Sequence, residues 1–336
     1  MTATRPITAL ILAAGKGTRM KSTKAKVLHE VFFAPMLHHV LDAVQPLAPR
    51  QTIIVIGHEG EQVKAAASEY PVIFAEQRQQ LGTGHAVLAA EKHLIQAENG
   101  TAMILCGDTP LIRAQTLEHM VAEHFARAVS LSVMTTVLAD PTNYGRIVDD
   151  GAGNVLRIVE EKDASPEERE IREVNAGIYC AETRFLLAAL AQVDSDNKQG
   201  EFYLTDIVGI ANREGHAVHR FLCPDPMEVL GVNSRQELAQ AHAGLQQRRN
   251  RELMAAGVTI LQPETTFVEK QVAIGPDTVL HPGVHLRGKT VVGRGCSIGP
   301  YAILHDTVLA DGARVGPSSF VAGAWVAKDQ SIPAGT

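Results

Sequence analysis

Residues 7–28 read ITALILAAGKGTRMKSTKAKVL, and they predict a buried strand followed by an anion-binding loop. The apolar run from Ile7 to Ala13 has the length and composition of a buried strand. It leads directly into Gly15 and Gly17, which allow a tight turn with several backbone N–H groups facing one oxyanion. Cationic side chains that can neutralise phosphate follow at Arg19, Lys21, Lys24 and Lys26.

The spacing excludes two common phosphate loops. A Walker A loop requires G-x-x-x-x-G-K-[ST], which does not occur in this stretch, and a dinucleotide fingerprint requires a third glycine where Met20 stands. The glycine pair therefore predicts a nucleotide loop of another type.

The composition is that of a globular protein with two domains. The chain has 336 residues, of which 45% are hydrophobic and 20% charged. A formal net charge of -6 gives no overall attraction to nucleic acid or to an anionic membrane, so neither is an expected partner. The four cysteines are widely spaced without a C-x-x-C pair, which favours reduced thiols. Without a signal peptide pattern or a membrane-length apolar run, we expect a cytoplasmic protein.

The first 125 residues alternate between strand-like and helix-like segments, the pattern of a parallel sheet covered on both faces. The expected strands are 7–13, 52–57, 72–75 and 102–107, and the expected helices are 36–44, 60–69 and 84–95. Ligands of such sheets bind at the carboxyl ends of the strands, where Gly15 and Asp108 fall. Both segments therefore point to one crevice.

From residue 129 the pattern becomes rich in strands, at 129–138, 145–161 and 174–182. Asp150-Gly151 between alternating runs indicates a hairpin, and the charged segment after Ala164 reads as a solvated insertion. We expect these strands to widen the same sheet and cover its crevice.

A helix and a repeat complete the chain. SRQE at 234–237 is a capping box and Gly257 is a stop signal, which predicts a connecting helix over 234–257 after a first domain of residues 1–233. In residues 258–336 an aliphatic residue recurs every six positions, with one five-residue step from Leu304 to Leu309. This is the hexapeptide repeat of a parallel β-helix, whose exposed faces favour association, and we expect a trimer. The aliphatic positions are Val268, Ile274, Leu280, Leu286, Val292, Ile298, Leu304, Leu309, Val315 and Val321.

Several polar residues near strand ends suit a nucleotide, a metal and a sugar. Gln77 and Gln80 carry amides that match a pyrimidine edge, and Asp108 after a buried strand suits Mg²⁺. The polar groups available for sugar hydroxyls are Glu160, Asn175, Tyr203 and Thr205, and Asn233 stands before the connecting helix. Taken alone, Asp108 reads as a turn or cap residue, and Gly15 and Lys26 reverse that interpretation. Taken alone, Glu160 reads as a surface acid and Asn233 as a helix-start residue. No zinc pattern occurs.

Nine segments resemble, in order, the uridylyltransferase domain of the bacterial bifunctional N-acetylglucosamine-1-phosphate uridylyltransferase/glucosamine-1-phosphate acetyltransferase family. They are LAAGKGTRM (12–20), AKVLH (25–29), QLGTGHA (80–86), GDTPLI (107–112), DPTNYGRI (140–147), IVEEKDA (158–164), VNAGIY (174–179), GEFYLTDI (200–207) and GVNS (231–234). The match covers residues 7–257 and continues into the repeat. The resemblance implies an α/β Rossmann-like nucleotidyltransferase domain with a mixed, mostly parallel sheet, followed by a left-handed parallel β-helix.

The resemblance also implies a reaction and a set of site residues. The reaction joins UTP to N-acetylglucosamine 1-phosphate and releases pyrophosphate, with Mg²⁺ as cofactor. The implied nucleotide site comprises Leu12, Ala13, Ala14, Gly15, Gln77, Gly82 and Thr83. Arg19 and Lys26 would bind phosphates, Asp108 and Asn233 would hold Mg²⁺, and Arg19, Lys26 and Asp108 would be catalytic. The implied sugar site comprises Gly145, Glu160, Asn175, Tyr203 and Thr205.

Two departures from the family pattern affect these expectations. Cys106 stands where the family has tyrosine, which bears on the sugar contacts on that side. The family continues into further coils that carry its acetyltransferase site, so we expect no acetyltransferase activity from these residues. Three alternatives stay open: a nucleotidyltransferase for another base or sugar, a non-catalytic nucleotide-sensing oligomer, and acyl transfer by the β-helix.

Overall fold

The computed structural model describes residues 6–57 and 59–336. The chain forms two compact units. One contains the chain up to Glu30 together with Ala34–Leu238, and the other contains Val31–Phe33 and Ala239–Thr336.

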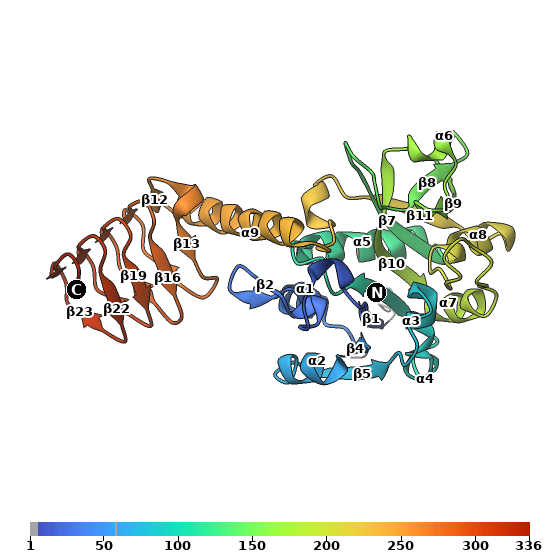
Figure 1. The fold of residues 1–336 in the computed structure, drawn as a ribbon, viewed down its shortest axis with the longest axis horizontal. Coiled ribbons are helices and arrows are strands. Elements are labelled where there is room, and N and C mark those ends of the chain that lie inside the picture. The colour runs from blue at the N-terminus through green and yellow to red at the C-terminus, as the bar shows by residue number, and fades with distance from the viewer. Residues whose placement is uncertain (1–5, 58) are drawn as a thin grey trace. The chain divides into compact units, whose positions relative to one another are not determined.

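The first unit is built on one mixed sheet, which has nine strands within the described residues. Its path runs β11-β7-β10-β6-β1-β4-β5, and β8 and β9 form a hairpin beside β10 (Figure 1). The neighbouring pairs β1–β4, β1–β6, β4–β5 and β7–β11 are parallel, whereas β10 runs antiparallel to both β6 and β7. The bounds are β1 Ile7–Ala13, β4 Gln51–Ile56, β5 Val72–Glu76, β6 Thr101–Cys106, β7 Leu131–Val137, β8 Arg146–Asp149, β9 Val155–Val159, β10 Glu173–Glu182 and β11 Val218–Leu222. The expected Rossmann-like sheet and its widening by the later strands are confirmed.

Helices cover both faces of this sheet, because successive strand residues point to opposite sides. Leu10 and Ile53 pack into one core with helices α3, α4, α7 and α8, whereas Ile11 and Ile54 pack into the other with α1, α2 and α5. The bounds are α1 Met36–Val44, α2 Gly60–Ala66, α3 Thr83–Leu88, α4 Glu91–Ile95, α5 Ala114–Arg127, α7 Thr183–Leu190 and α8 Asp206–Arg213. Burial on two sides explains the continuous apolar runs of the central strands.

One local expectation is wrong, and one expected insertion has more structure than the sequence indicated. The helix expected over 84–95 is two helices, α3 and α4, because the Ala90 N–H bonds to Val87 O at 3.0 Å, three residues back, and ends the first helix. The charged insertion also contains a short helix, α6 (Pro166–Arg169). Ser165 and Glu168 form its capping box, with Glu168 N to Ser165 Oγ at 3.2 Å.

Helix α9 (Arg235–Ala255) occupies the position expected for the connecting helix, and Gly257 follows it with φ +94°. Ser234 Oγ accepts from Glu237 N at 3.2 Å, as the capping box predicts. The reciprocal bond differs from expectation, since the Glu237 carboxylate accepts from the N–H of Asn233, at 2.7 Å, one residue before the cap. Among the helices of the described residues, none combines the length and apolar character required to cross a membrane.

The second unit contains a left-handed parallel β-helix made of three parallel sheets (Figure 1). One sheet stacks β12 (Thr259–Ile260), β15 (Val279–Leu280), β18 (Ser297–Ile298), β21 (Arg314–Val315) and β24 (Ser331–Ile332). The second stacks β13 (Phe267–Val268), β16 (His285–Arg287), β19 (Ile303–His305) and β22 (Phe320–Ala322). The third stacks β14 (Ala273–Ile274), β17 (Val291–Val292), β20 (Val308–Leu309) and β23 (Trp325–Val326). A separate two-stranded ribbon pairs β2 (Glu30–Val31) with β3 (Ala34–Pro35).

The hexapeptide positions form the core of this β-helix. Leu280, Leu286 and Leu304 are fully buried, and Ile274 is the half-buried member of the predicted series. Two coils of this sheet are shorter by a residue: Ala273 pairs with Val291, eighteen positions on, whereas Val291 pairs with Val308 and Val308 with Trp325, each seventeen positions on. The repeat is therefore confirmed, and the step is absorbed without breaking the sheets.

Candidate functional site

The site lies at the carboxyl end of β1, where the chain enters the glycine loop. Gly17 has φ +57°, and a Cβ added there would lie 2.7 Å from Cβ of Lys26. Glycine therefore allows the loop to pack directly against the segment that carries this lysine. Two short 3₁₀ helices follow the loop, Thr18–Met20 with Arg19 and Lys26–Leu28 with Lys26.

Three predicted residues from distant parts of the chain meet at one point. Lys26 Nζ forms an ion pair with the Asp108 carboxylate and donates to Asn233 Oδ1 at 3.0 Å. The side chains of Lys26 and Asp108 are 15% and 13% exposed. Val232 N donates to Asp108 O at 2.9 Å, which fixes the Asn233 segment beside β6. The contact therefore joins the ends of β1 and β6 to the start of α9.

The donor chemistry of this point fits a hard cation. Asp108 offers a carboxylate and Asn233 a carbonyl oxygen, and both face the same ammonium group. Mg²⁺ is commonly held by one or two protein oxygens together with substrate phosphates and water. Within the described residues no cluster of three or more His, Cys, Asp or Glu side chains offers a fuller metal cage.

The predicted nucleotide residues lie at a second part of the same sheet edge, beside the glycine loop. Gln77 is 4% exposed, and its Nε2 contacts Gly82 O at 3.1 Å and His85 Nδ1 at 3.0 Å. Gln80 Nε2 donates to Ala14 O at 3.0 Å, which ties this segment to the glycine loop. Leu12 is half-buried, Ala13 and Ala14 are buried and Gly15 is exposed. A cavity of about 650 Å³ opens here, lined by Lys16, Gly57, Glu59, Glu76, Gln77, Arg78 and Gln80.

Gly82 and Thr83 hold the turn into α3. Gly82 has φ +113°, and a Cβ there would lie 2.5 Å from Phe202 O. Thr83 Oγ1 accepts from Leu204 N at 3.0 Å. These contacts attach the nucleotide side to the segment that carries Tyr203 and Thr205.

The predicted sugar residues also come together. Asn175 N donates to Gly145 O at 2.8 Å, and Thr205 Oγ1 donates to Glu160 Oε1 at 3.2 Å. A Cβ on Gly145 would lie 3.5 Å from the same Glu160 oxygen. The register of β10 with β7 shifts just after Asn175, so a bulge changes the direction of the strand at this residue.

Tyr203 lies deeper than its neighbours in this set. It is 7% exposed, and its hydroxyl donates to Asp163 Oδ2 at 3.2 Å and accepts from Gln199 Nε2 at 2.6 Å. A cavity of about 440 Å³ adjoins it and is shared with Glu160, Thr205 and Asp206. Burial, followed by the carboxylates of Asp194 and Asp163, raises the pKa of Asp206 to about 6.

Arg146 connects the segments that carry the predicted sugar residues, and sequence reasoning missed it. Its side chain is buried in β8, pairs with Glu161 Oε2 at 2.5 Å, and donates to the carbonyl oxygens of Tyr144 and, at 3.4 Å, Arg169. These contacts connect the residues before β8 to those after β9, where Gly145 and Glu160 stand. An arginine in the motif NYGRI gave no sign of burial, because its partners lie in other segments.

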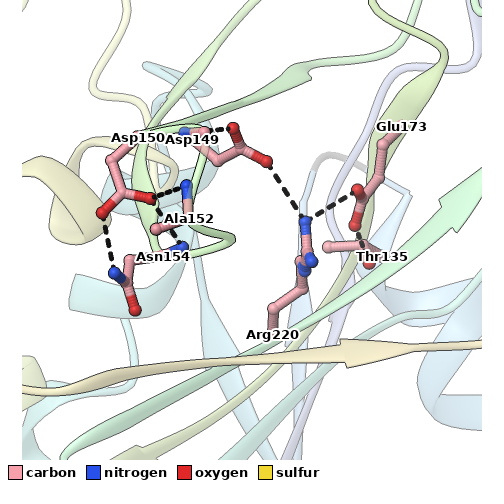
Figure 2. Close-up of polar contacts among 8 residues, drawn as sticks. Thr135, Asp149, Asp150, Ala152, Asn154, Glu173 and Arg220 are labelled. Carbon is pink, nitrogen blue, oxygen red and sulfur yellow. Dashed lines mark hydrogen bonds and ion pairs between the residues drawn. The ribbon is translucent and has the colours of Figure 1, made fainter.

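Ion pairs also connect the hairpin of β8 and β9 to the neighbouring strands of the sheet (Figure 2). Arg220 of β11 stands between Asp149 and Glu173, with Nη1 to oxygen distances of 3.4 and 3.1 Å. Thr135 Oγ1 donates to the other Glu173 oxygen at 2.6 Å. The network in Figure 2 connects this hairpin to β10 and β11. The predicted sugar residues Gly145 and Glu160 flank the hairpin.

Three further residues lie at this edge of the sheet, namely Cys106, Tyr144 and Arg19. Cys106 ends β6, and its thiol faces Gly177 O at 3.7 Å; burial raises the pKa of this thiol to about 12, so it stays protonated. Tyr144 lies near Asp108 and Arg19, and burial followed by the Glu237 and Asp108 charges raises its pKa to about 12. Arg19 is exposed, as a residue that binds an incoming phosphate would be.

Comparison with known proteins agrees with this arrangement. Residues 9–258 match the model of the MobA-like NTP transferase domain, and residues 271–305 match the bacterial transferase hexapeptide model. The chain is 50% identical over 329 residues to the "Bifunctional protein GlmU" of Desulfotalea psychrophila, covering 98% of this chain and 97% of that protein. The chain belongs to the GlmU family. The GlmU protein of Geobacter metallireducens is 48% identical over 90% of this chain, and 64% of its own length is covered.

A solved structure supports the fold of this GlmU family member. A putative glucose-1-phosphate thymidylyltransferase from Bacillus anthracis superimposes with a TM-score of 0.57 at 20% identity, covering 70% of this chain and 94% of that one. The GlmU relatives and the matched domain make this chain a sugar-1-phosphate nucleotidyltransferase, specifically a uridylyltransferase that forms UDP-N-acetylglucosamine.

Proposed function

We propose that the uridylyltransferase reaction of this chain takes place between its nucleotide and sugar sides, with Mg²⁺ at Asp108 and Asn233. UTP would lie along the glycine loop with its base toward Gln77, Gly82 and Thr83, and N-acetylglucosamine 1-phosphate would lie against Glu160 and its neighbours. The observation that carries this assignment is the meeting of Lys26, Asp108 and Asn233 at one point of the sheet edge.

The chemistry needs no protein nucleophile. A sugar phosphate is ionised at neutral pH, so its oxygen can attack the α-phosphorus of UTP while pyrophosphate leaves from the opposite side. Lys26 and Arg19 would neutralise charge on the phosphates, and the backbone of the glycine loop would hold them in line. When bound, Mg²⁺ supplies positive charge to the phosphate oxygens. Asp108 and Asn233 would hold it through their side-chain oxygens.

A substrate panel tests this proposal. Four nucleoside triphosphates are each combined with N-acetylglucosamine, glucosamine and glucose 1-phosphates, and pyrophosphate release is measured with and without Mg²⁺. We expect the fastest release from UTP with N-acetylglucosamine 1-phosphate, and almost none without the metal. Faster release with another triphosphate or sugar would reassign the substrate, and UTP binding without turnover for any sugar would favour a nucleotide sensor.

We further propose a homotrimer formed through the β-helix. Large apolar side chains point outward from its sheets, among them Trp325 at 70%, Phe320 at 63% and Val291 at 44% exposure. Such residues favour burial against further copies of the chain. Sedimentation equilibrium is expected to give about three times the chain mass of 36.1 kDa, and Trp325→Glu is expected to lower it. A wild-type mass of one chain at micromolar concentration would reject the trimer.

A further inference from the structure

Arg235 contacts two separate segments of the candidate site. Its Nε donates to Met20 O at 3.3 Å, and its Nη1 donates to His29 Nδ1 at 3.3 Å. Met20 ends the 3₁₀ helix that carries Arg19, and His29 directly follows the one that carries Lys26. A single guanidinium therefore joins the two short helices that bear the predicted phosphate-binding cations.

Arg235 is itself fixed beside the predicted metal ligand. It begins α9 two residues after Asn233, whose N–H donates to Glu237 Oε2 at 2.7 Å. Asn233 Oδ1 in turn accepts from Lys26 Nζ at 3.0 Å. Asn233 thus contacts Lys26 itself, and Arg235 in the first turn of α9 contacts His29 just after the Lys26 helix.

His29 suits the role of acceptor. Its ring is 6% exposed, and within the described residues its buried Nε2 has no hydrogen-bond partner. Burial, followed by the charges of Arg235 and Lys24, lowers the pKa of His29 and keeps the ring neutral. A neutral ring with its proton on Nε2 leaves Nδ1 free to accept from a guanidinium.

We infer that Arg235 is a positioning residue that sets the separation of Arg19 and Lys26 to match the triphosphate of the nucleotide. The guanidinium is suited to this task because its planar donors point in fixed directions, which a lysine ammonium does not reproduce. The inference rests on the proposed function, since it requires a nucleoside triphosphate at the glycine loop.

Binding measurements test the inference without relying on turnover. Calorimetric titration of UTP with Mg²⁺ and of uridine into the wild type and Arg235→Met is expected to show UTP binding weakened about tenfold and uridine binding within twofold. Arg235→Lys should recover part of the lost affinity. The matched control is Arg251→Met, an exposed position later in the same helix, which should bind UTP as the wild type does.

A double-mutant cycle separates positioning from direct phosphate contact. His29→Leu removes the acceptor and leaves Arg235 in place, so it should weaken UTP binding similarly, and the double variant should be no worse than either single one. Additive losses would assign Arg235 a direct contact with phosphate and overturn the inference. So would UTP binding that is unchanged in Arg235→Met, or uridine binding that weakens equally.

The wild type provides the separate check on the proposed function. If the wild type binds UTP and catalyses turnover, and Arg235→Met binds UTP equally well, this inference alone is rejected. A wild type that binds no UTP rejects the proposed function together with the inference.

Discussion

An Asp108→Asn protein is expected to release pyrophosphate from UTP and N-acetylglucosamine 1-phosphate about 100- to 1,000-fold more slowly than the wild type. Asp108 and Asn233 both contact Lys26, and the neutral amide removes the negative charge required to hold Mg²⁺. A coupled pyrophosphatase assay under saturating substrates measures the change in kcat.

The control for lost negative charge is Glu30→Gln. Glu30 has a side chain that is 67% exposed and lies 4.0 Å from Lys24. It should keep wild-type turnover, and both variants should unfold at temperatures close to that of the wild type. Normal turnover by Asp108→Asn would show that this carboxylate is not the metal ligand.

An Arg146→Met protein is expected to lose about 3–5 kcal/mol of unfolding free energy, the range found when one partner of a buried ion pair is removed. The side chain is 1% exposed, and its loss leaves Glu161 without its cation and the carbonyls of Tyr144 and Arg169 without this donor. Urea denaturation followed by circular dichroism measures the change.

Arg184→Met is the matched control, because Arg184 has a 73% exposed side chain and a 3.8 Å contact with Glu98. Its effect should stay below about 1 kcal/mol. If Arg146→Met also cost less than this, the contacts of Arg146 would not support Gly145 and Glu160. Any Arg146→Met protein that remains folded should bind N-acetylglucosamine 1-phosphate more weakly, since Gly145 directly precedes Arg146 and Glu160 directly precedes its partner Glu161.

Local sequence pattern accounts for most of the fold. The run before Gly15 predicted β1, and the period of six predicted a core that contains Leu280, Leu286 and Leu304. These features are short in range, because a strand covered on both faces reads as a continuous apolar run and burial in the β-helix repeats with each side of a coil. The break between α3 and α4 was not predicted, since Ala89 and Ala90 are both strong helix formers and the bond from Ala90 N–H to Val87 O has no sequence signal.

Site residues were predictable only where the residue type and the neighbouring strand or loop signal together indicated a function. Asp108 and Lys26 are charged groups after strand and loop signals, and the structure brings them into contact. Arg146 pairs with Glu161 and Arg235 with His29, residues in other segments of the chain, so these partners emerged only from the folded chain. The roles of the nucleotide and sugar residues stay predictions until ligands are measured.

The stacked coils of the β-helix have a consequence for how this protein can change over evolutionary time. Each strand pairs with the equivalent strands of the coils next to it, seventeen or eighteen residues away after the first coil, as in the pairs Val279–Ser297 and Ser297–Arg314. Gene duplication or deletion of one whole coil would therefore rejoin identical edges and leave the remaining core layers intact. Insertion of a few residues inside a strand would instead turn aliphatic side chains outward. Heritable variation in this region should accordingly come in lengths of one coil, with shorter additions confined to the corners.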